Sequence, residues 1–223
     1  MAVQLKLEVC VALAPSLPLA MSLASLSEKL AAQNSAGATI LTLQGDGRRL
    51  ALAPHLTVYQ FAVPLEKMSA AVDELYFIAK KYSDFSLQGS NFAANATEGS
   101  IELKYSVTPD LAALQMEVVE KLSPLRCGLC LERSPDGLSV ADAILEDDDE
   151  NSPLSKYGFG EYGDTFNPHV TLSWLRPGCR SVADPLVGGA APDYSGVFDC
   201  LNVYAMGPQG TCPQLLASLP FVK

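Results

Sequence analysis

The chain contains little histidine: only two of its 223 residues, His55 and His169. Basic residues are also scarce, since 15 Lys and Arg are set against 25 Asp and Glu and the formal net charge is −10. This balance argues against binding along a long nucleic-acid duplex, because such binding depends on clustered Lys and Arg. It leaves open a nucleotide or a short RNA end, for which a few local donors are enough.

A long uninterrupted apolar run is lacking as well. Residues 7–27 are rather apolar, but Glu8, Pro15 and Pro18 interrupt them. We therefore expect neither a membrane-spanning helix nor a secretory signal, and no membrane partner. The six cysteines are then expected to be reduced thiols in the cytoplasm, with the nucleus as an open alternative.

The two histidines lie in the same short pattern, in which proline precedes the histidine and threonine follows two residues after it. The two copies read Pro54-His55-Leu56-Thr57-Val58 and Pro168-His169-Val170-Thr171-Leu172. Both segments are rich in β-branched residues and predict strands. On a strand, alternate residues share a face. The pattern therefore predicts one polar stripe of His55, Thr57 and Tyr59, and a second of His169, Thr171 and Ser173. Two histidines packed in the core are the alternative interpretation.

Two facing imidazoles can divide acid–base work between them. A neutral ring accepts a proton from a nucleophile, and a charged ring donates one to a leaving group, because the pKa of histidine lies near neutrality. Threonine hydroxyls can donate hydrogen bonds to anionic oxygens. This combination suits the cleavage of a phosphodiester and requires neither a metal nor a cofactor.

The two motifs resemble those of the 2H phosphoesterase superfamily, which includes the LigT-like RNA phosphodiesterases. The resemblance covers residues 54–59 and 167–174, and the apolar segment 201–207 lies where such proteins have a last core strand. It implies an α/β (α+β) fold for residues 1–223 as a single bilobal domain. Two pseudo-symmetric lobes, with mostly antiparallel sheets flanked by helices, would each give one H-x-T strand to a central cleft.

The resemblance also implies a function. The chain would be a metal-independent phosphodiesterase acting on a nucleoside 2′,3′-cyclic phosphate or a related RNA-terminal phosphodiester. By motif position, His55 and His169 would be the acid–base pair, and Thr57 and Thr171 would bind the phosphate oxygens. Two alternatives stay open: a nucleotide-binding regulatory module with little turnover, and an RNA-end ligase or 3′-end trimming enzyme. We expect the chain to act as a monomer.

Four further residues are candidates for substrate contact. Tyr59 and Ser173 follow their motif threonines on the expected polar stripes, Arg176 follows the second motif, and Tyr162 lies in a segment of alternating aromatics and glycines that could stack on a base. The pair Cys127-x-x-Cys130 has no second pair to complete a zinc site. We therefore predict no metal.

The remaining pattern predicts alternating strands and helices. Strands are expected near residues 5–13, 39–43, 85–92, 101–107, 128–132 and 201–207, and helices near 18–33, 64–82 and 109–122. Residues 142–156, which hold the acidic run 146–150, and residues 176–196 are expected to be loops.

Overall fold

The strands and helices follow the apolar pattern of the sequence. The structure is a computed structural model that describes residues 5–33, 53–94, 100–130, 151–174, 190–207 and 210–222. The strands are β1 (Lys6–Pro15), β2 (Leu56–Pro64), β3 (Phe85–Leu87), β4 (Gly89–Ala94), β5 (Ser100–Tyr105), β6 (His169–Trp174), β7 (Gly196–Ala205) and β8 (Gln214–Pro220). The α-helices are α1 (Leu17–Gln33), α2 (Met68–Ala79), α3 (Pro109–Leu122) and α5 (Pro153–Tyr157), joined by short 3₁₀ turns.

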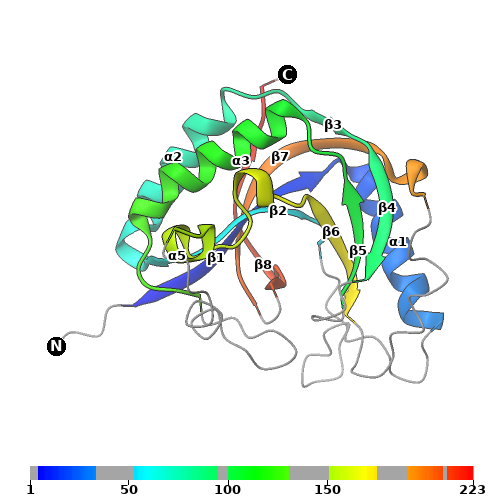
Figure 1. Cartoon of the computed structure of the whole chain (residues 1–223), viewed down its shortest axis with the longest axis horizontal. Helices are drawn as coiled ribbons and strands as arrows, with labels where there is room; N and C mark the ends of the chain where they lie inside the picture. The colour runs from blue at the N-terminus through cyan, green and yellow to red at the C-terminus, as the bar shows by residue number, and fades with distance from the viewer. Residues whose placement is uncertain are drawn as a thin grey trace.

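The eight strands form one continuous sheet in the order β3-β7-β1-β2-β6-β5-β4, with β8 also paired to β7 (Figure 1). The strand pairs within it are antiparallel. The strands that carry the two histidine motifs, β2 and β6, are therefore neighbours at the middle of the sheet, although nearly half of the chain separates them in sequence.

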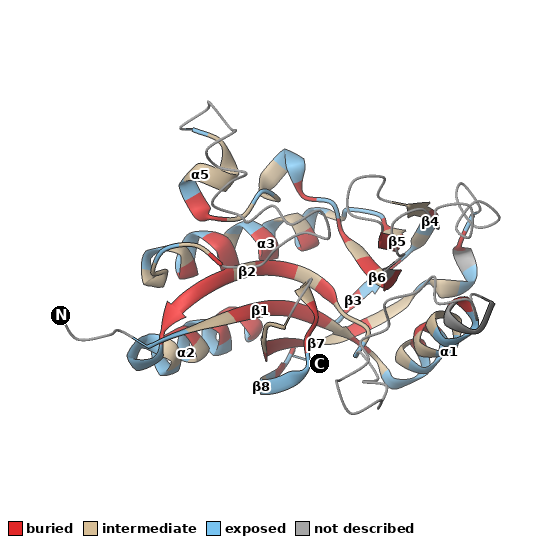
Figure 2. Ribbon diagram, turned by 90° about the horizontal axis from the view of Figure 1, so that it is seen from below, coloured by how far each residue is buried: buried red, intermediate tan, exposed pale blue. Residues whose placement is uncertain are grey.

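One face of the sheet carries the apolar core. Val9, Val11 and Leu13 of β1 are fully buried there and belong to the same cluster as the apolar residues of α1, α2 and α3. The intervening Cys10 and Ala12 are also buried, but they belong to a separate small cluster with Tyr204 and Cys212. Because side chains alternate along a strand, this second cluster marks the opposite face. Both β1 and β2 are buried along most of their length (Figure 2).

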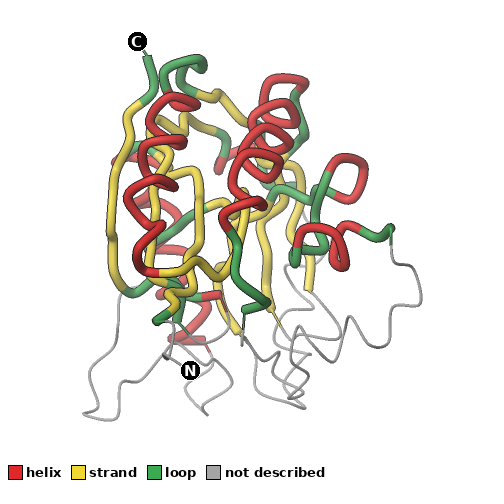
Figure 3. The backbone as a smooth tube through the Cα atoms, turned by 90° about the vertical axis from the view of Figure 1, so that its left-hand side faces the viewer, coloured by secondary structure: helices red, strands yellow, loops and turns green. Residues whose placement is uncertain are grey.

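The helices on the core face begin and end as their sequences dictate. Helix α3 starts at Pro109, whose fixed φ suits the first helical position, and the Thr108 hydroxyl accepts a hydrogen bond from the Leu111 amide at 3.2 Å. Its buried positions recur at helical spacing: Leu111, Leu114, Gln115, Val118, Val119 and Leu122. Helices α2 and α3 run side by side against the strands (Figure 3).

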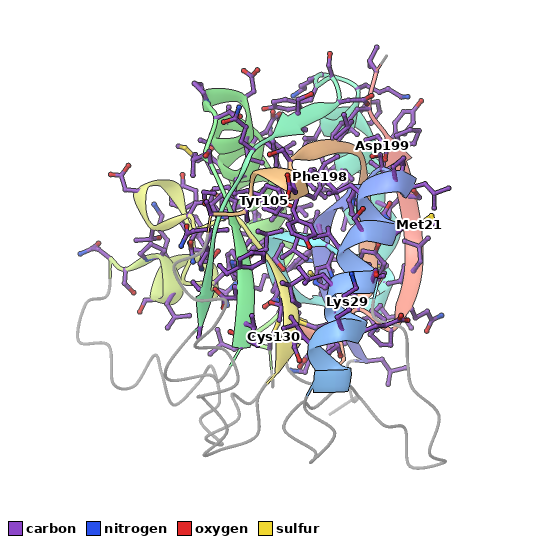
Figure 4. The ribbon with its side chains drawn as sticks, turned by 90° about the vertical axis from the view of Figure 1, so that its right-hand side faces the viewer. Met21, Lys29, Tyr105, Cys130, Phe198 and Asp199 are labelled. Atoms are coloured by element: carbon purple, nitrogen blue, oxygen red, sulfur yellow. The ribbon has the colours of Figure 1, made fainter. Side chains whose placement is uncertain are left out.

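The sheet is strongly curved. The rings of Tyr105 on β5 and Phe198 on β7 meet edge to face, with centroids 5.2 Å apart, although three strands separate β5 from β7 in the sheet. Figure 4 shows both rings inside the molecule beside α1. An isolated bridge also pairs Asn91 of β4 with Ala190, which precedes β7 in the chain. The core is thus enclosed between the curved sheet and the helices.

Most of the predicted elements are confirmed, with some corrections. The predicted strand at 85–92 is divided into β3 and β4 at Gln88, and Gly89 lies so close to Ala191 that a Cβ atom would be 2.5 Å from its carbonyl oxygen. The helix predicted over 64–82 is a 3₁₀ turn at Leu65–Lys67 followed by α2. Within the predicted loop at 142–156, residues 153–156 are helical and begin α5.

Two strands differ from the sequence-based prediction. Residues 128–130 are not part of a strand, contrary to the prediction for 128–132, and strand β8 was not predicted. Strand β8 lies at an edge, where Leu215 and Leu216 are exposed, so its sequence lacks a clear alternation of buried apolar and exposed polar residues. The predicted strand at 39–43 lies outside the described residues. Among the described helices, none has both the length and the apolar character needed to cross a membrane.

Candidate active site

The two histidine motifs are brought together by the pairing of β2 with β6. Leu56 lies opposite Val170 in this antiparallel pair. The register places His55 opposite Thr171 and Thr57 opposite His169, all on one face. The two histidines are therefore diagonal neighbours, and in a regular antiparallel pair the Cα atoms of diagonal neighbours are about 7–8 Å apart. All four side chains are half-buried.

Each histidine ring is held by the backbone in the same way. Nδ1 of His55 is 2.9 Å from the carbonyl oxygen of Ala53, and Nδ1 of His169 is 2.7 Å from that of Asn167. A carbonyl oxygen only accepts hydrogen bonds, so Nδ1 carries the proton and donates in both rings. The Nε2 atom of each ring is therefore the nitrogen that can accept a proton or give one up.

A bulge follows the threonine of each motif. Ala12 lies opposite Thr57 but Val11 opposite Tyr59, so Val58 has no partner on β1. In the pair of β5 with β6, Glu102 lies opposite Thr171 but Ile101 opposite Ser173. Leu172 of β6 therefore has no partner on β5. An unmatched residue shifts the alternation of the side chains that follow.

The bulges overturn the prediction that Tyr59 and Ser173 continue the polar stripes. Tyr59 is fully buried in the core, stacks on Phe61 at 4.8 Å and donates a hydrogen bond from its hydroxyl to the Tyr157 carbonyl at 2.8 Å. Ser173 lies opposite the buried Ile101 and is itself 2% exposed. Period-two alternation misplaced both residues because it assumed a regular strand.

Helix side chains bind the carbonyl groups of the unmatched residues. Gln115 of α3 directs its amide toward the Val58 carbonyl, with 3.5 Å between nitrogen and oxygen, and donates a shorter bond of 2.7 Å to the Glu161 carbonyl. Ser27 of α1 donates to the Leu172 carbonyl at 2.5 Å. Buried carbonyl groups outside the sheet ladder need such partners, so each motif strand is fixed to a helix at its bulge.

The surroundings of His55 are rich in sulfur. Its Nε2 lies 3.4 Å from Sγ of Cys212, and Sγ of Cys10 lies 3.8 Å from the Thr57 hydroxyl. The hydrogen bond from Cys212 lowers the pKa of the Cys10 thiol well below its usual range, although burial opposes the shift. Burial alone would lower the pKa of His55, but the hydrogen bond and charge of Cys10 outweigh it and raise that pKa.

The surroundings of His169 are ionic. Its Nε2 lies 4.0 Å from Oε1 of Glu102, and the same carboxylate forms an ion pair with Lys104 and accepts a 2.6 Å hydrogen bond from Ser100. Burial favours a raised pKa for Glu102, but the charge of His169 and the bonds from Lys104 and Ser100 lower it. A cavity of about 220 Å³ opens here, lined by Ala93, Ala94, Glu102, Lys104, Glu161, Asn167 and His169.

Tyr162, another predicted substrate contact, is not among the residues that line this cavity. The Tyr162 hydroxyl donates to Glu120 of α3 at 2.5 Å and its ring packs on Tyr157, with centroids 4.5 Å apart, while its neighbour Glu161 lines the cavity. Arg176 lies outside the described residues. Cys127 and Cys130, the C-x-x-C pair of the sequence, form no disulfide. The Cys127 amide donates a hydrogen bond to the Ala62 carbonyl at 2.9 Å.

Sequence reasoning missed three residues that lie against the histidines: Cys10, Glu102 and Cys212. Glu102 and Lys104 were detectable in part, because two charged residues at alternate positions of an otherwise apolar strand indicate a polar face. The two cysteines carried no local signal, since the pairing of β1 with its neighbours and the turn before β8 bring them to His55.

Comparison with known proteins shows which fold this is. No family model and no curated protein matches the sequence. Among solved structures, one described as a phosphoesterase matches with a TM-score of 0.57 and 15% identity over 98% of this chain and 100% of that one. Escherichia coli LigT matches with the same coverage, in complexes with 3′-AMP (TM-score 0.55, 16% identity) and with NADP⁺ (0.58, 14%). The chain therefore has the fold of LigT.

Proposed function

We propose that the protein is a phosphodiesterase that hydrolyses a nucleoside 2′,3′-cyclic phosphate or a related RNA-terminal phosphodiester. The observation that carries the proposal is the matched pair of histidines. Each has Nδ1 bonded to the carbonyl two residues earlier, and the pairing of Leu56 with Val170 supports a common face for both rings and both threonines. Diagonal neighbours in a regular antiparallel pair have Cα atoms about 7–8 Å apart, a spacing compatible with one phosphate group held between two imidazoles.

The reaction follows from this arrangement. One imidazole accepts at Nε2 a proton from water as the water oxygen bonds to phosphorus. The bond from phosphorus to one ribose oxygen breaks, and the other histidine donates its Nε2 proton to that oxygen. The Thr57 and Thr171 hydroxyls donate hydrogen bonds to the non-bridging oxygens, whose charge grows in the transition state. The product is a nucleoside monophosphate, and the protein contributes no cofactor.

An approximate two-fold relation between two halves of the sheet is part of the proposal. The strand order around β2 and β6 supports it, because β1 and β7 flank one motif strand and β5 and β4 flank the other. The unmatched residue after each motif threonine also supports it. The axis would pass between Leu56 and Val170, so the two halves would meet at the catalytic face as two lobes.

The ligands of LigT favour a nucleotide substrate. The solved structures of that protein include complexes with 3′-AMP, NADP⁺ and ATP. The cavity beside His169 has Lys104, Asn167 and Glu161 in its wall, and these side chains can bind phosphate, ribose or base through hydrogen bonds. A nucleotide-binding module with little turnover is the second candidate function, because the same complexes show binding.

Hydrolysis of 2′,3′-cyclic nucleotides in the presence of a chelator tests the proposal. Loss of one acid–base group lowers rates by about 10²–10⁴-fold, so His55→Ala and His169→Ala are each expected to reduce kcat by that factor. Thr57→Val and Thr171→Val are expected to lower kcat/KM by removing one donor to the phosphate. Tyr76→Ala, at an exposed position of α2, is the control and should behave as wild type.

Two outcomes would decide against hydrolysis. If both histidine variants keep wild-type activity, the acid–base assignment is wrong. If the wild-type protein binds nucleoside monophosphates in calorimetry but cleaves no cyclic or linear diester, the binding module replaces the enzyme.

A further inference from the structure

Three potential metal ligands from distant parts of the chain meet at one point on the sheet. The Sγ atoms of Cys10 and Cys212 and a ring nitrogen of His55 all lie within 4.8 Å of one another. Cys10 comes from β1, His55 immediately precedes β2, and Cys212 lies just before β8. We propose that these three residues form a binding site for a thiophilic divalent cation of the Zn²⁺ class. The proposal replaces the sequence-based expectation that the chain binds no metal.

The distances suit a tetrahedral ion. Zn²⁺ binds cysteine sulfur at about 2.3 Å and histidine nitrogen at about 2.0–2.1 Å, so the ligand atoms of a tetrahedral site lie roughly 3.5–3.8 Å apart. Nε2 of His55 and Sγ of Cys212 are already 3.4 Å apart, and the largest separation in the group is within 4.8 Å. A side-chain movement of about 1 Å therefore completes the geometry.

The chemistry of the donors selects the ion. Thiolate and imidazole favour Zn²⁺ and its softer relatives, whereas Mg²⁺ and Ca²⁺ require oxygen ligands. A ligating histidine usually donates its other ring nitrogen to a carbonyl or carboxylate, which orients the ring. Nδ1 of His55 makes such a bond to the Ala53 carbonyl, so Nε2 faces the two thiols in the required orientation.

The fold holds the two sulfurs in place. Cys10 is fully buried and Cys212 is 5% exposed, and both pack with Ala12 and Tyr204. The turn before Cys212 is closed by a 2.7 Å hydrogen bond from the Gly207 amide to the Thr211 carbonyl. Because burial excludes competing water, attraction between thiolate and cation is stronger there than at the surface.

A fourth ligand position borders the phosphate-binding face. The Thr57 hydroxyl lies 3.8 Å from Sγ of Cys10, so water or a phosphate oxygen can complete the coordination there. On the same face, Oδ1 of the buried Asn202 has no hydrogen-bond partner among the described residues, and Asn202 lies opposite Ala12. This amide oxygen can accept a hydrogen bond from a metal-bound water.

Occupation of the site would switch off the proposed diesterase. Nε2 of His55 can hold a proton or a metal ion, and an ion there removes one of the two acid–base groups. This consequence rests on the proposed function, whereas binding of the ion does not. Metal binding and diester cleavage are therefore measured separately.

The binding experiment uses the full chain, reduced with a phosphine and stripped of metal by a chelator. Titration with Cd²⁺ is expected to give an ultraviolet sulfur-to-metal charge-transfer band that saturates at one equivalent and is displaced by Zn²⁺. Cys10→Ser, Cys212→Ser and His55→Ala should each weaken binding by at least about tenfold. Matching Cys→Ala variants, checked by circular dichroism, show whether a loss reflects the ligand or the fold.

Two control proteins identify the sulfurs. Cys200→Ser removes a half-buried thiol on β7 outside the cluster, and Cys127→Ser/Cys130→Ser removes the only C-x-x-C pair. Both are expected to keep the band at one equivalent. The proposal is refuted if the wild type gives no band, if the band survives in Cys10→Ser/Cys212→Ser, or if it disappears in the Cys127→Ser/Cys130→Ser control.

The activity experiment separates the two proposals. With the diesterase active, stoichiometric Zn²⁺ should inhibit the wild type and the Cys200→Ser control, and the residual activity of Cys10→Ser/Cys212→Ser should not respond to Zn²⁺. A Cd²⁺ band without diester cleavage by the metal-free protein would reject the proposed function and retain the metal site. Cleavage that Zn²⁺ leaves unchanged while the site is saturated would reject the inhibitory role.

Discussion

Replacement of Tyr59 by phenylalanine distinguishes a residue of the core from a residue of the substrate site. The Tyr59 hydroxyl donates to the Tyr157 carbonyl at 2.8 Å, and the ring is stacked on Phe61 and meets Phe159 edge to face. The Tyr59→Phe variant keeps both ring contacts and removes only the hydroxyl. Its effect on stability therefore measures this single hydrogen bond and the carbonyl that it leaves behind.

The expected loss of stability is about 1–2 kcal/mol. A hydrogen bond contributes roughly 0.5–1.5 kcal/mol net, and a buried acceptor left without a donor costs roughly 1–3 kcal/mol. Tyr59 is 0% and Tyr157 8% exposed, so water reaches the stranded carbonyl poorly, while removal of the buried hydroxyl itself offsets part of the loss. For a protein of this size, each kcal/mol corresponds to about 2–4 °C in Tm, which predicts a decrease of roughly 2–8 °C.

Urea denaturation and steady-state kinetics of cyclic-nucleotide hydrolysis provide the two measurements. The free energy of unfolding should fall by the amount above, and KM should stay within twofold of wild type because the ring lies on the core face. Tyr76→Phe, which changes a half-exposed ring on α2, should alter neither quantity. An increase in KM of fivefold or more with unchanged stability would show that Tyr59 contacts substrate and that the bulge assignment is wrong.

Two further predictions concern stability near each histidine. The lowered pKa of Glu102 means that its ionised form stabilises the fold above the unfolded-state pKa of about 4.3 and that this contribution disappears as pH falls through the lower folded-state value. The gap in unfolding free energy between wild type and Glu102→Gln, roughly 1–3 kcal/mol at neutral pH, should therefore stay constant above about pH 5 and narrow only below it. A gap that stays constant in a denaturation series extended to about pH 2 would contradict the charge assignment. Gly207→Ala introduces a Cβ atom 2.7 Å from the Thr211 hydroxyl and should lower stability by about 1–3 kcal/mol through overpacking. Thermal denaturation checks this loss of stability, with Gly160→Ala as the control because a Cβ atom there meets nothing within 4 Å. Equal Tm values for the two variants would refute the overpacking at Gly207.

The sequence predicted the elements whose signals are local. Helix α3 was bounded correctly because Thr108 and Pro109 form its start and its apolar residues recur at helical spacing. The motif strands were found because their β-branched residues alternate with polar ones. The position of Tyr59 was not predictable in this way, since an unmatched residue at Val58 is a property of the pairing with β1 and leaves no mark in β2 itself.

The contacts around the histidines depend on the order of the strands. Cys10 and Cys212 are 202 positions apart, and they meet because β1 and the β7–β8 turn approach the same face. Glu102 reaches His169 because β5 pairs with β6. Local periodicity gives the face of each strand but not its neighbour, so the motifs could be predicted while the groups that control their chemistry could not.

The difference between those neighbours bears on how two similar motifs can perform different tasks. Opposite Thr57 lies Ala12, and opposite Thr171 lies Glu102. Ala12 packs with the two thiols that lie beside His55, whereas the carboxylate of Glu102 lies 4.0 Å from Nε2 of His169. The proposed acid–base catalysis needs one proton acceptor and one proton donor, and the groups near Nε2 differ between the two rings, with a thiol near His55 and a carboxylate near His169. If the proposed mechanism holds, positions 12 and 102 are where the surroundings of the two repeated motifs diverge.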